Sequence, residues 1–348
     1  MIERREQRRA RTAFGLGLII LGLAMSRPVG RVYASEGAAA SESPAASQQV
    51  NERAAAEQAL MQGEIDKAVA AAERMTAANS GDGAAYMVLC RSYYAEAHAD
   101  EAIGACLKAA QALPHSSEAR DWLGRAYGMK AEHAGPIAGL SLAMKVKAAF
   151  ESAVAVNPRD GAAVNDLSEF YIDAPAILGG GLDRAAALAD EVQGQLPQQA
   201  HRIRARAAVK EKDYGTAERE FRAAVGVANL PNAWVDLGAF YMERGEYDKA
   251  VDALKQGLAV DHAKDASVVD AASLLDRMHR EQGVAEQALR EYLESGAKSD
   301  AAPAIEVHVM LGKLLAGEGN KAGAKIEFDK ALEMASGYAP AKQALRTM

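Results

Sequence analysis

The amino-acid sequence predicts an all-α protein, a solenoid in which short helical hairpins are stacked in a row. Three observations support this fold class. Aromatic residues make up only 5% of the 348 residues, which is few for a β-sandwich or β-barrel. Alanine, the strongest helix former, is abundant along the whole chain. Small and large apolar residues also recur at fixed spacings, as they do when each unit of a stack packs against its neighbours.

Residues 1–34 have the three-part layout of an export signal. Five arginines precede an apolar run over residues 13–25, and Val32-Tyr33-Ala34 places a small residue at the expected cleavage point. The run has 13 residues, fewer than the roughly 20 of a membrane-spanning helix. We therefore expect Sec-type export to the periplasm or cell envelope of a bacterium, with cleavage after Ala34. A twin-arginine signal and an uncleaved anchor are the alternatives, and only the anchor would place the protein at a membrane.

Residues 35–48 are rich in alanine, serine and glutamate. We expect them to form a disordered tether, because they hold too little apolar surface to fold. The formal net charge of the whole chain is −7. Removing residues 1–34, with seven Arg and two Glu, takes away a net +5 and leaves −12. Nucleic acid is not an expected partner of such a chain, because the proteins that bind it present basic surfaces.

The clearest repeat lies within residues 234–254. It reads W-x-x-L-G-x-x-Y from Trp234 to Tyr241 and A-x-x-x-L from Ala250 to Leu254. This pattern resembles the tetratricopeptide repeat, a helix–turn–helix unit of 34 residues. The resemblance implies a right-handed superhelix in which the first helix of each repeat lines the concave face.

The same positions recur along the chain, which predicts about eight repeats over residues 49–338. The small position of the second helix is filled by Ala68, Ala102, Val146, Ala185, Ala217, Ala250, Ala288 and Ala324. Four residues later come Ala72, Cys106, Phe150, Ala189, Phe221, Leu254, Tyr292 and Phe328. Small residues let the two helices approach closely, and large ones fill the space to the next repeat. Residues 339–348 are expected to form a final helix that caps the exposed end.

Two repeats are longer than 34 residues. Extra residues lie around 133–140 and around 174–181, in both cases between the two helices, so both are expected on the same edge of the solenoid. They include the apolar residues Ile137, Leu140, Ile177 and Leu178. These side chains either contact a partner or pack on one another as a structural elaboration.

No pattern of catalytic or metal-binding residues stands out. The seven histidines are scattered, without the H-x-x-x-H spacing of a metal site on a helix. Two cysteines cannot provide a four-cysteine zinc site. Three glycines at 179–181 are not followed by the Lys-Ser/Thr of a phosphate-binding loop. We therefore expect no enzyme activity, no metal and no cofactor.

The two cysteines occupy facing positions of the second repeat. Cys90 takes the small position of its first helix, and Cys106 takes the large position of its second helix. In an exported protein they could form a disulfide, worth about 3 kcal/mol in the chain-entropy model. The alternative is a pair of reduced, buried side chains.

Several side chains are predicted to face the concave groove from the first helices. They are Arg53, Arg91, Tyr94, Arg125, Asn165, Arg202, Arg206 and Arg277. The planar guanidinium of arginine is suited to binding carboxylates. We therefore expect an extended acidic peptide, or a free C-terminus, to bind there. The alternative is that these arginines pair with Glu57, Asp121 and Glu169 and leave the groove neutral.

Taken together, these features favour a non-enzymatic scaffold or adaptor that binds a partner protein in its concave groove. The second hypothesis is a periplasmic binding module for a small or polymeric ligand, such as a cell-wall fragment. Aromatic walls would favour that second hypothesis, and Tyr94 is the one evident candidate for them.

Overall fold

A computed structural model describes residues 44–348, with side chains from Val50 onward. The predicted signal segment and most of the predicted tether lie outside the described residues. Within them the chain forms seventeen α-helices, one short 3-10 helix and no strand longer than a single bridge. None of these helices combines the length and the apolar character needed to cross a bilayer. The all-α solenoid of helical hairpins is therefore confirmed.

The helices form antiparallel pairs, and the first and second helix of each pair are called A and B. In chain order they are α2 (Pro44–Met61), α3 (Ile65–Ala78), α4 (Gly83–Ala95), α5 (Ala99–Ala112), α6 (Ser117–Glu132), α7 (Pro136–Val156), α8 (Gly161–Asp173), α9 (Leu182–Val192), α10 (Pro197–Glu211), α11 (Tyr214–Ala228), α12 (Pro231–Glu243), α13 (Tyr247–Val260), α14 (Ala266–Arg277), α15 (Gln282–Glu294), α16 (Ala304–Gly317) and α17 (Lys321–Met334). The short helix η1 (Ala176–Leu178) lies between α8 and α9, and α18 (Ala339–Thr347) ends the chain where the capping helix was expected.

Helices A and B pack closely wherever a small residue of one faces a large residue of the other. A Cβ added to Gly312 on α16 would lie 2.5 Å from Phe328 Cε1, and one added to Gly238 on α12 would lie 2.7 Å from Leu254 Cδ2. Such distances are too short for a real side chain, so glycine is required at both positions. The repeated small and large residues in the sequence therefore correspond to contacts between the two helices of a hairpin.

The seventh repeat is shifted by three residues from the predicted alignment. In the other repeats, except the third with its extended α7, the small residue is the fourth residue of helix B, as Ala250 is in α13. In α15 that position is Ala285, and Ala288 was wrongly assigned to it. The extra residues of this repeat lie after α15, in the nine-residue connection 295–303. Asp270 is therefore the fifth residue of α14, the position that Val235 holds in α12 and that was predicted for Ser273.

Two other boundaries differ from the prediction. Helix α2 begins at Pro44, so residues 44–48 are helical and the tether ends earlier than predicted. The first insertion extends the N-terminal end of α7, which reaches 21 residues. Ile137 on α7 and Ile177 in η1 are 89% and 88% exposed. Of the four apolar residues Ile137, Leu140, Ile177 and Leu178, only Leu178 is buried, so the packing of all four on one another is wrong.

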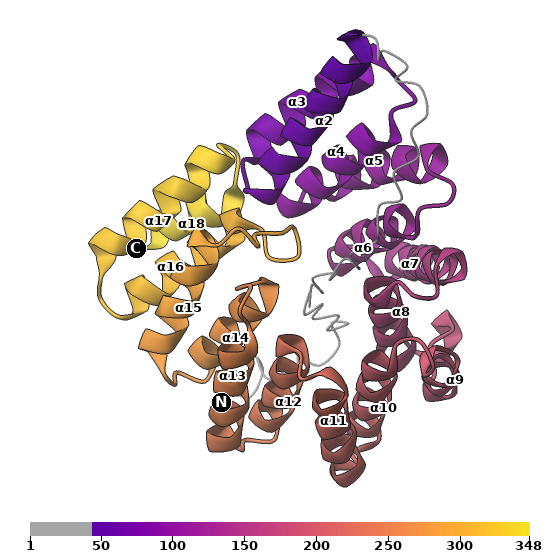
Figure 1. Cartoon of the computed structure of the whole chain (residues 1–348), viewed down its shortest axis with the longest axis vertical. Coiled ribbons are helices and arrows are strands. Elements are labelled where there is room, and N and C mark those ends of the chain that lie inside the picture. The colour runs from indigo at the N-terminus through magenta and orange to yellow at the C-terminus, as the bar shows by residue number, and fades with distance from the viewer. Residues whose placement is uncertain (1–43) are drawn as a thin grey trace, which may run out of the picture.

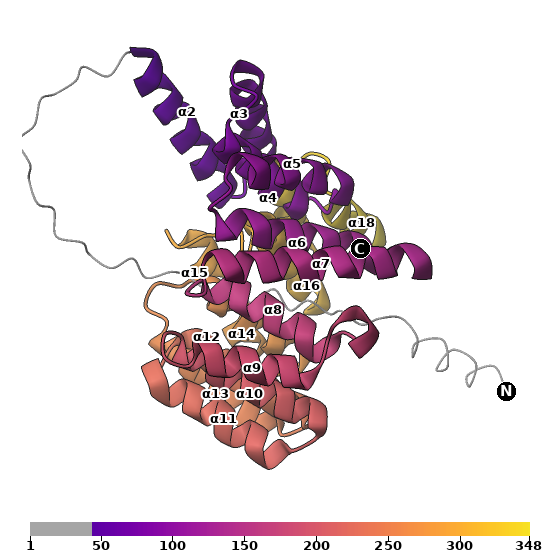
Figure 2. The same cartoon turned by 90° about the vertical axis from the view of Figure 1, so that its right-hand side faces the viewer.

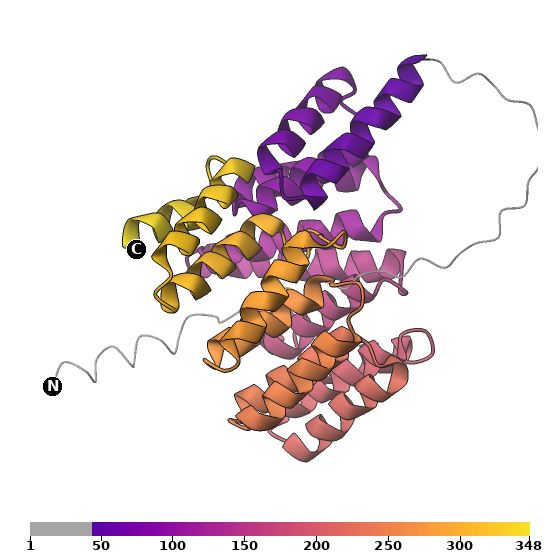
Figure 3. The same cartoon turned by 60° about the vertical axis from the view of Figure 1, so that its left-hand side comes forward.

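The repeats curve through a full turn, so the last repeat returns to the first (Figure 1). Figure 2 shows α6 to α11 as layers of roughly parallel helices, and Figure 3 shows α17 and α18 beside the N-terminal helices from another side. The backbone N–H of Ser336 donates to Asp66 Oδ2 at 3.0 Å. One apolar cluster also contains both Leu60 and Ile305. The solenoid is therefore a closed ring whose helices A face a common interior.

Candidate functional site

The concave face carries buried arginines, each held between two carboxylates. On α6, Arg125 donates from Nε to Asp166 Oδ2 at 2.6 Å, and its Nη2 lies 3.0 Å from Asp121 Oδ2. Burial acts against the charged guanidinium, but the two carboxylates outweigh it and raise the pKa of Arg125 above its usual value. Arg125 therefore stays charged and links α6 to α8 through its ion pairs.

The same arrangement recurs further along the ring. On α10, Arg202 donates from Nη2 to Glu169 Oε1 at 2.7 Å and from Nε to Asp236 Oδ2 at 3.0 Å. It thereby joins α8, α10 and α12. Arg202 is only 3% exposed, so its charge faces these two partners rather than solvent.

Arg91 on α4 completes the set of three. It pairs with Asp300 in the loop before α16, and its Nη1 lies 3.5 Å from Glu118 Oε1. Arg91, Arg125 and Arg202 were predicted to face the groove, and each is neutralised by its carboxylate partners. This corresponds to the alternative of paired arginines. An acidic partner stays a prediction, and these ion pairs do not favour it.

The remaining predicted site residues have different surroundings. Arg53 pairs with Asp82 at 3.0 Å, and Arg206 Nη2 lies 3.8 Å from Asp173. Tyr94 packs edge-on against Trp122, with ring centroids 5.2 Å apart. The buried Oδ1 atom of Asn165 has no hydrogen-bond partner among the described residues. Arg277 lines a cavity.

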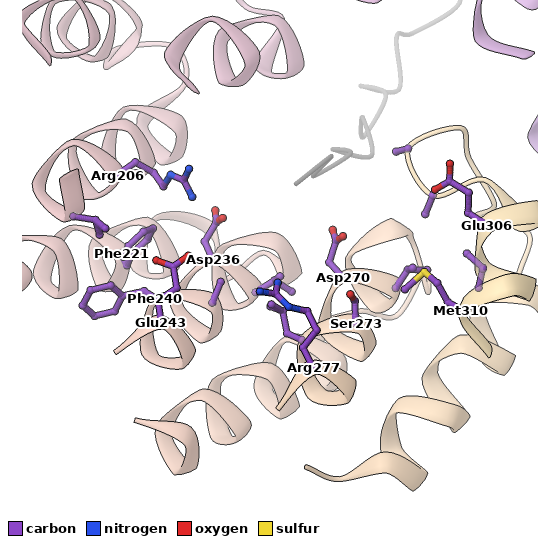
Figure 4. Close-up of a pocket in the computed structure, with 18 residues that line it drawn as sticks. Arg206, Phe221, Asp236, Phe240, Glu243, Asp270, Ser273, Arg277, Glu306 and Met310 are labelled. Carbon is purple, nitrogen blue, oxygen red and sulfur yellow. The ribbon is translucent and has the colours of Figure 1, made fainter. Parts of the chain in front are cut away.

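That cavity lies between α10, α12, α14 and α16 and has a volume of about 270 Å³ (Figure 4). Its wall contains four carboxylates, from Asp236, Glu243, Asp270 and Glu306, and two guanidiniums, from Arg206 and Arg277. Apolar side chains make up most of the rest of the wall. The sequence reasoning missed these four acidic residues. All four lie on three successive helices A, α12, α14 and α16, so a run of acidic residues on the first helices was the signal that could have revealed them.

Glu243, Asp270 and Glu306 have no ion-pair partner among the described residues, and of these three only Glu243 is exposed to solvent. Asp270 Oδ2 is buried and accepts no hydrogen bond there. Burial, together with the nearby charges of Asp236 and Asp265, raises the pKa of Asp270 well above its usual value. Burial also raises the pKa of Glu306 to about 7. A negative charge on Asp270 or Glu306 is therefore unfavourable in this cavity unless a positive group binds beside it.

Cys90 and Cys106 are joined by a disulfide between α4 and α5. Their Cα atoms are 4.9 Å apart, and both side chains are fully buried. Among the residues from 44 to 348, no three His, Cys, Asp or Glu side chains converge as a metal site would require.

Comparison with known proteins supports the repeat type. The tetratricopeptide repeat family model matches residues 231–262 and 305–338. These are the α12–α13 hairpin and the region from α16 to the residue before α18. No curated protein matches the chain.

Three solved structures of similar proteins come from different organisms. A tetratricopeptide repeat protein of Thermus thermophilus is 19% identical, with 65% of this chain and 98% of that chain covered and a TM-score of 0.44. Yeast Tom70 is 15% identical, with 84% and 64% covered and a TM-score of 0.47. A tetratricopeptide repeat protein of Parabacteroides merdae is 13% identical, with 86% and 98% covered and a TM-score of 0.41.

Proposed function

We propose that this chain of tetratricopeptide repeats is a non-enzymatic interaction module that holds an extended segment of a partner protein along its concave face. Repeats of this type generally mediate protein–protein interactions and offer long concave surfaces for binding. The observation that carries the proposal is the row of polar side chains on successive helices A. Arg91, Arg125 and Arg202 are fixed by ion pairs along this row, so the surface is rigid before a partner binds.

The interior favours a segment with positive charge. Each of the three fixed arginines is matched by two carboxylates, and Asp270 and Glu306 add two carboxyl groups without an ion-pair partner among the described residues. A partner of opposite charge gains most in such a site, because charge complementarity guides association.

Export to the periplasm or cell envelope is part of the proposal. The layout of residues 1–34 supports it. The disulfide between Cys90 and Cys106 is also typical of oxidising compartments. The mass of the protein isolated from cell fractions tests this: cleavage after Ala34 supports export, and retention of residues 1–34 in a membrane fraction indicates the anchor instead.

A periplasmic binding module for a small or polymeric ligand is the second candidate. The cavity of about 270 Å³, lined by both charged and apolar side chains, favours it. Pockets for small molecules are usually about 300–1,000 Å³, so the cavity is better matched to one side chain of a larger partner.

A photo-crosslinking experiment tests the interaction. A benzophenone amino acid replaces Arg206 on concave α10 in the full chain, and the same amino acid replaces the exposed Asp252 on α13 as the control. After irradiation in cells that produce the protein, mass spectrometry identifies crosslinked segments. A discrete segment captured from position 206 and absent from position 252 supports the proposal. Equal capture from both positions, or none, contradicts it.

A further inference from the structure

We propose that the cavity between α10, α12, α14 and α16 is an anchor pocket for one basic side chain, a lysine or arginine of the bound partner segment. This inference rests on the proposed function and goes beyond it by naming the chemistry that the groove selects. The pocket would take an aliphatic stem along its apolar wall and a positive head between Asp270 and Glu306.

The first argument is unpaired charge. Buried carboxylates in proteins are almost always paired, because moving a charge out of water is costly. Asp270 Oδ2 is buried without a hydrogen bond, and neither Asp270 nor Glu306 lies within ion-pair distance of a cation among the described residues. A positive group entering the cavity would offset this cost, and it would gain more than a neutral hydrogen-bond donor because it also forms an ion pair.

The arginines of the cavity wall do not supply that cation. Arg206 is directed to Asp173, 3.8 Å away, and the nearby Arg202 is committed to Glu169 and Asp236. In Figure 4, Asp270 and Glu306 point to the same side of the cavity, whereas Arg277 lies on the other side. The two carboxylates therefore have no cationic partner on their side of the cavity.

The second argument is shape. Phe240, Leu274 and Met310 give the cavity apolar walls next to the carboxylates. Lysine and arginine combine an apolar stem with a charged head and bury the stem along such walls. A divalent metal fits less well, because within residues 44–348 no three metal-ligating side chains come together.

The test uses the full chain and three capped pentapeptides. Acetyl-Ala-Ala-Lys-Ala-Ala-amide is compared with the same peptide carrying norleucine or glutamate in place of lysine. Binding is followed by NMR chemical-shift changes of the Met310 methyl group. We expect the lysine peptide to bind at least about tenfold more tightly than the other two, a difference of about 1.4 kcal/mol. Equal affinities, or no binding of any peptide at millimolar concentration, overturn the proposal.

Variants then assign the preference to the cavity. Asp270→Asn keeps the shape of the side chain and removes its charge, so it should abolish the preference for lysine. Asp252→Asn on the exposed face of α13 removes the same charge elsewhere and should leave the preference intact. Because Asp270→Asn removes an unpaired buried charge, it should not unfold the protein. A preference for lysine that survives Asp270→Asn would also overturn the proposal.

The crosslinking experiment separates this inference from the proposed function. A captured segment without lysine or arginine near the crosslink would contradict the anchor pocket and leave the interaction module standing. An acidic captured segment would do the same and would support the acidic partner predicted from the sequence. Free n-butylamine that binds as tightly as the lysine peptide would assign the pocket to small amines instead of a partner segment.

Discussion

Arg91 on α4 donates a hydrogen bond from Nε to the carboxylate of Asp300, although 209 residues separate them along the chain. Their side chains are only 15% and 16% exposed. Close by, a Cβ on Gly63 would lie 2.9 Å from the Cβ of Ala304. In most solenoids each repeat contacts only its neighbours. Here the ends of the array also meet, and the interior is enclosed.

Removing the Arg91–Asp300 contact should loosen the ring. We expect Asp300→Ala to lower the free energy of unfolding by about 1–3 kcal/mol, since it deletes a hydrogen bond to a charged group that is mostly buried. Small-angle X-ray scattering should show a larger radius of gyration. The matched control is Asp329→Ala, which breaks the exposed pair of Lys325 and Asp329 and should cost about 0.5 kcal/mol or less. If both variants leave size and stability unchanged, the contact does not hold the ring closed.

Reducing the disulfide should destabilise the second repeat. Cys90 and Cys106 are 16 residues apart in sequence, and a loop of this length is worth about 3 kcal/mol in the chain-entropy model. We expect dithiothreitol to lower the urea midpoint of the unmodified protein. The double variant Cys90→Ala/Cys106→Ala should have a lower midpoint that dithiothreitol does not change. An unmodified protein insensitive to the reductant would show that the bridge contributes little.

Stability of the free protein should fall as the pH rises through neutrality. Burial raises the pKa of Glu306 from 4.5 to about 7, so its folded form releases the proton later than its unfolded form. The stabilisation is complete below about pH 4.5 and is lost as the pH rises through 7, a change of about 3 kcal/mol. Tyr94 and Tyr338, whose pKa values burial and Glu306 raise, stay neutral throughout.

Urea unfolding at pH 5 and at pH 8 measures this dependence. Glu306→Gln, which stays neutral at both values, should remove most of the difference. The part that remains should belong to other carboxyl groups whose pKa values burial raises, Asp121 and Asp270 among them. A Glu306→Gln variant with the full pH dependence would mean that Glu306 is not its source.

The packing of helix pairs predicts opposite effects for two glycines of α16. An added methyl group at Gly312 would meet Phe328 at 2.5 Å, so Gly312→Ala should cost about 1–3 kcal/mol through overpacking. Nothing among the described residues lies within 4 Å of the same position on Gly317. Gly317→Ala should therefore be neutral or stabilise the protein by up to about 1 kcal/mol, because alanine favours the helix. Thermal unfolding of both variants checks the sign of each effect.

The sequence by itself determined the repeat, because the repeat is a local property. Gly312 and Phe328 lie 16 residues apart in one hairpin. Equivalent small and large residues recur in other hairpins, so the sequence shows this contact as a repeated spacing. The same register placed Arg91, Arg125 and Arg202 on the concave face. It failed in the seventh repeat, because the extra residues of that repeat lie in the connection 295–303 after α15, so Asp270 and not Ser273 is the fifth residue of α14.

Only the tertiary structure decided what those arginines do and where the ring closes. The partner of Arg91 lies 209 residues away, and no spacing within a repeat encodes such a pair. Whether a carboxylate is neutralised depends on the helices that curvature brings beside it. Asp236 meets Arg202 at 3.0 Å, whereas Asp270, one repeat further on, meets no cation among the described residues. The net charge of the groove depends on which charged side chains lie next to one another in space. The curvature of the eight repeats decides which helices, and so which side chains, become neighbours.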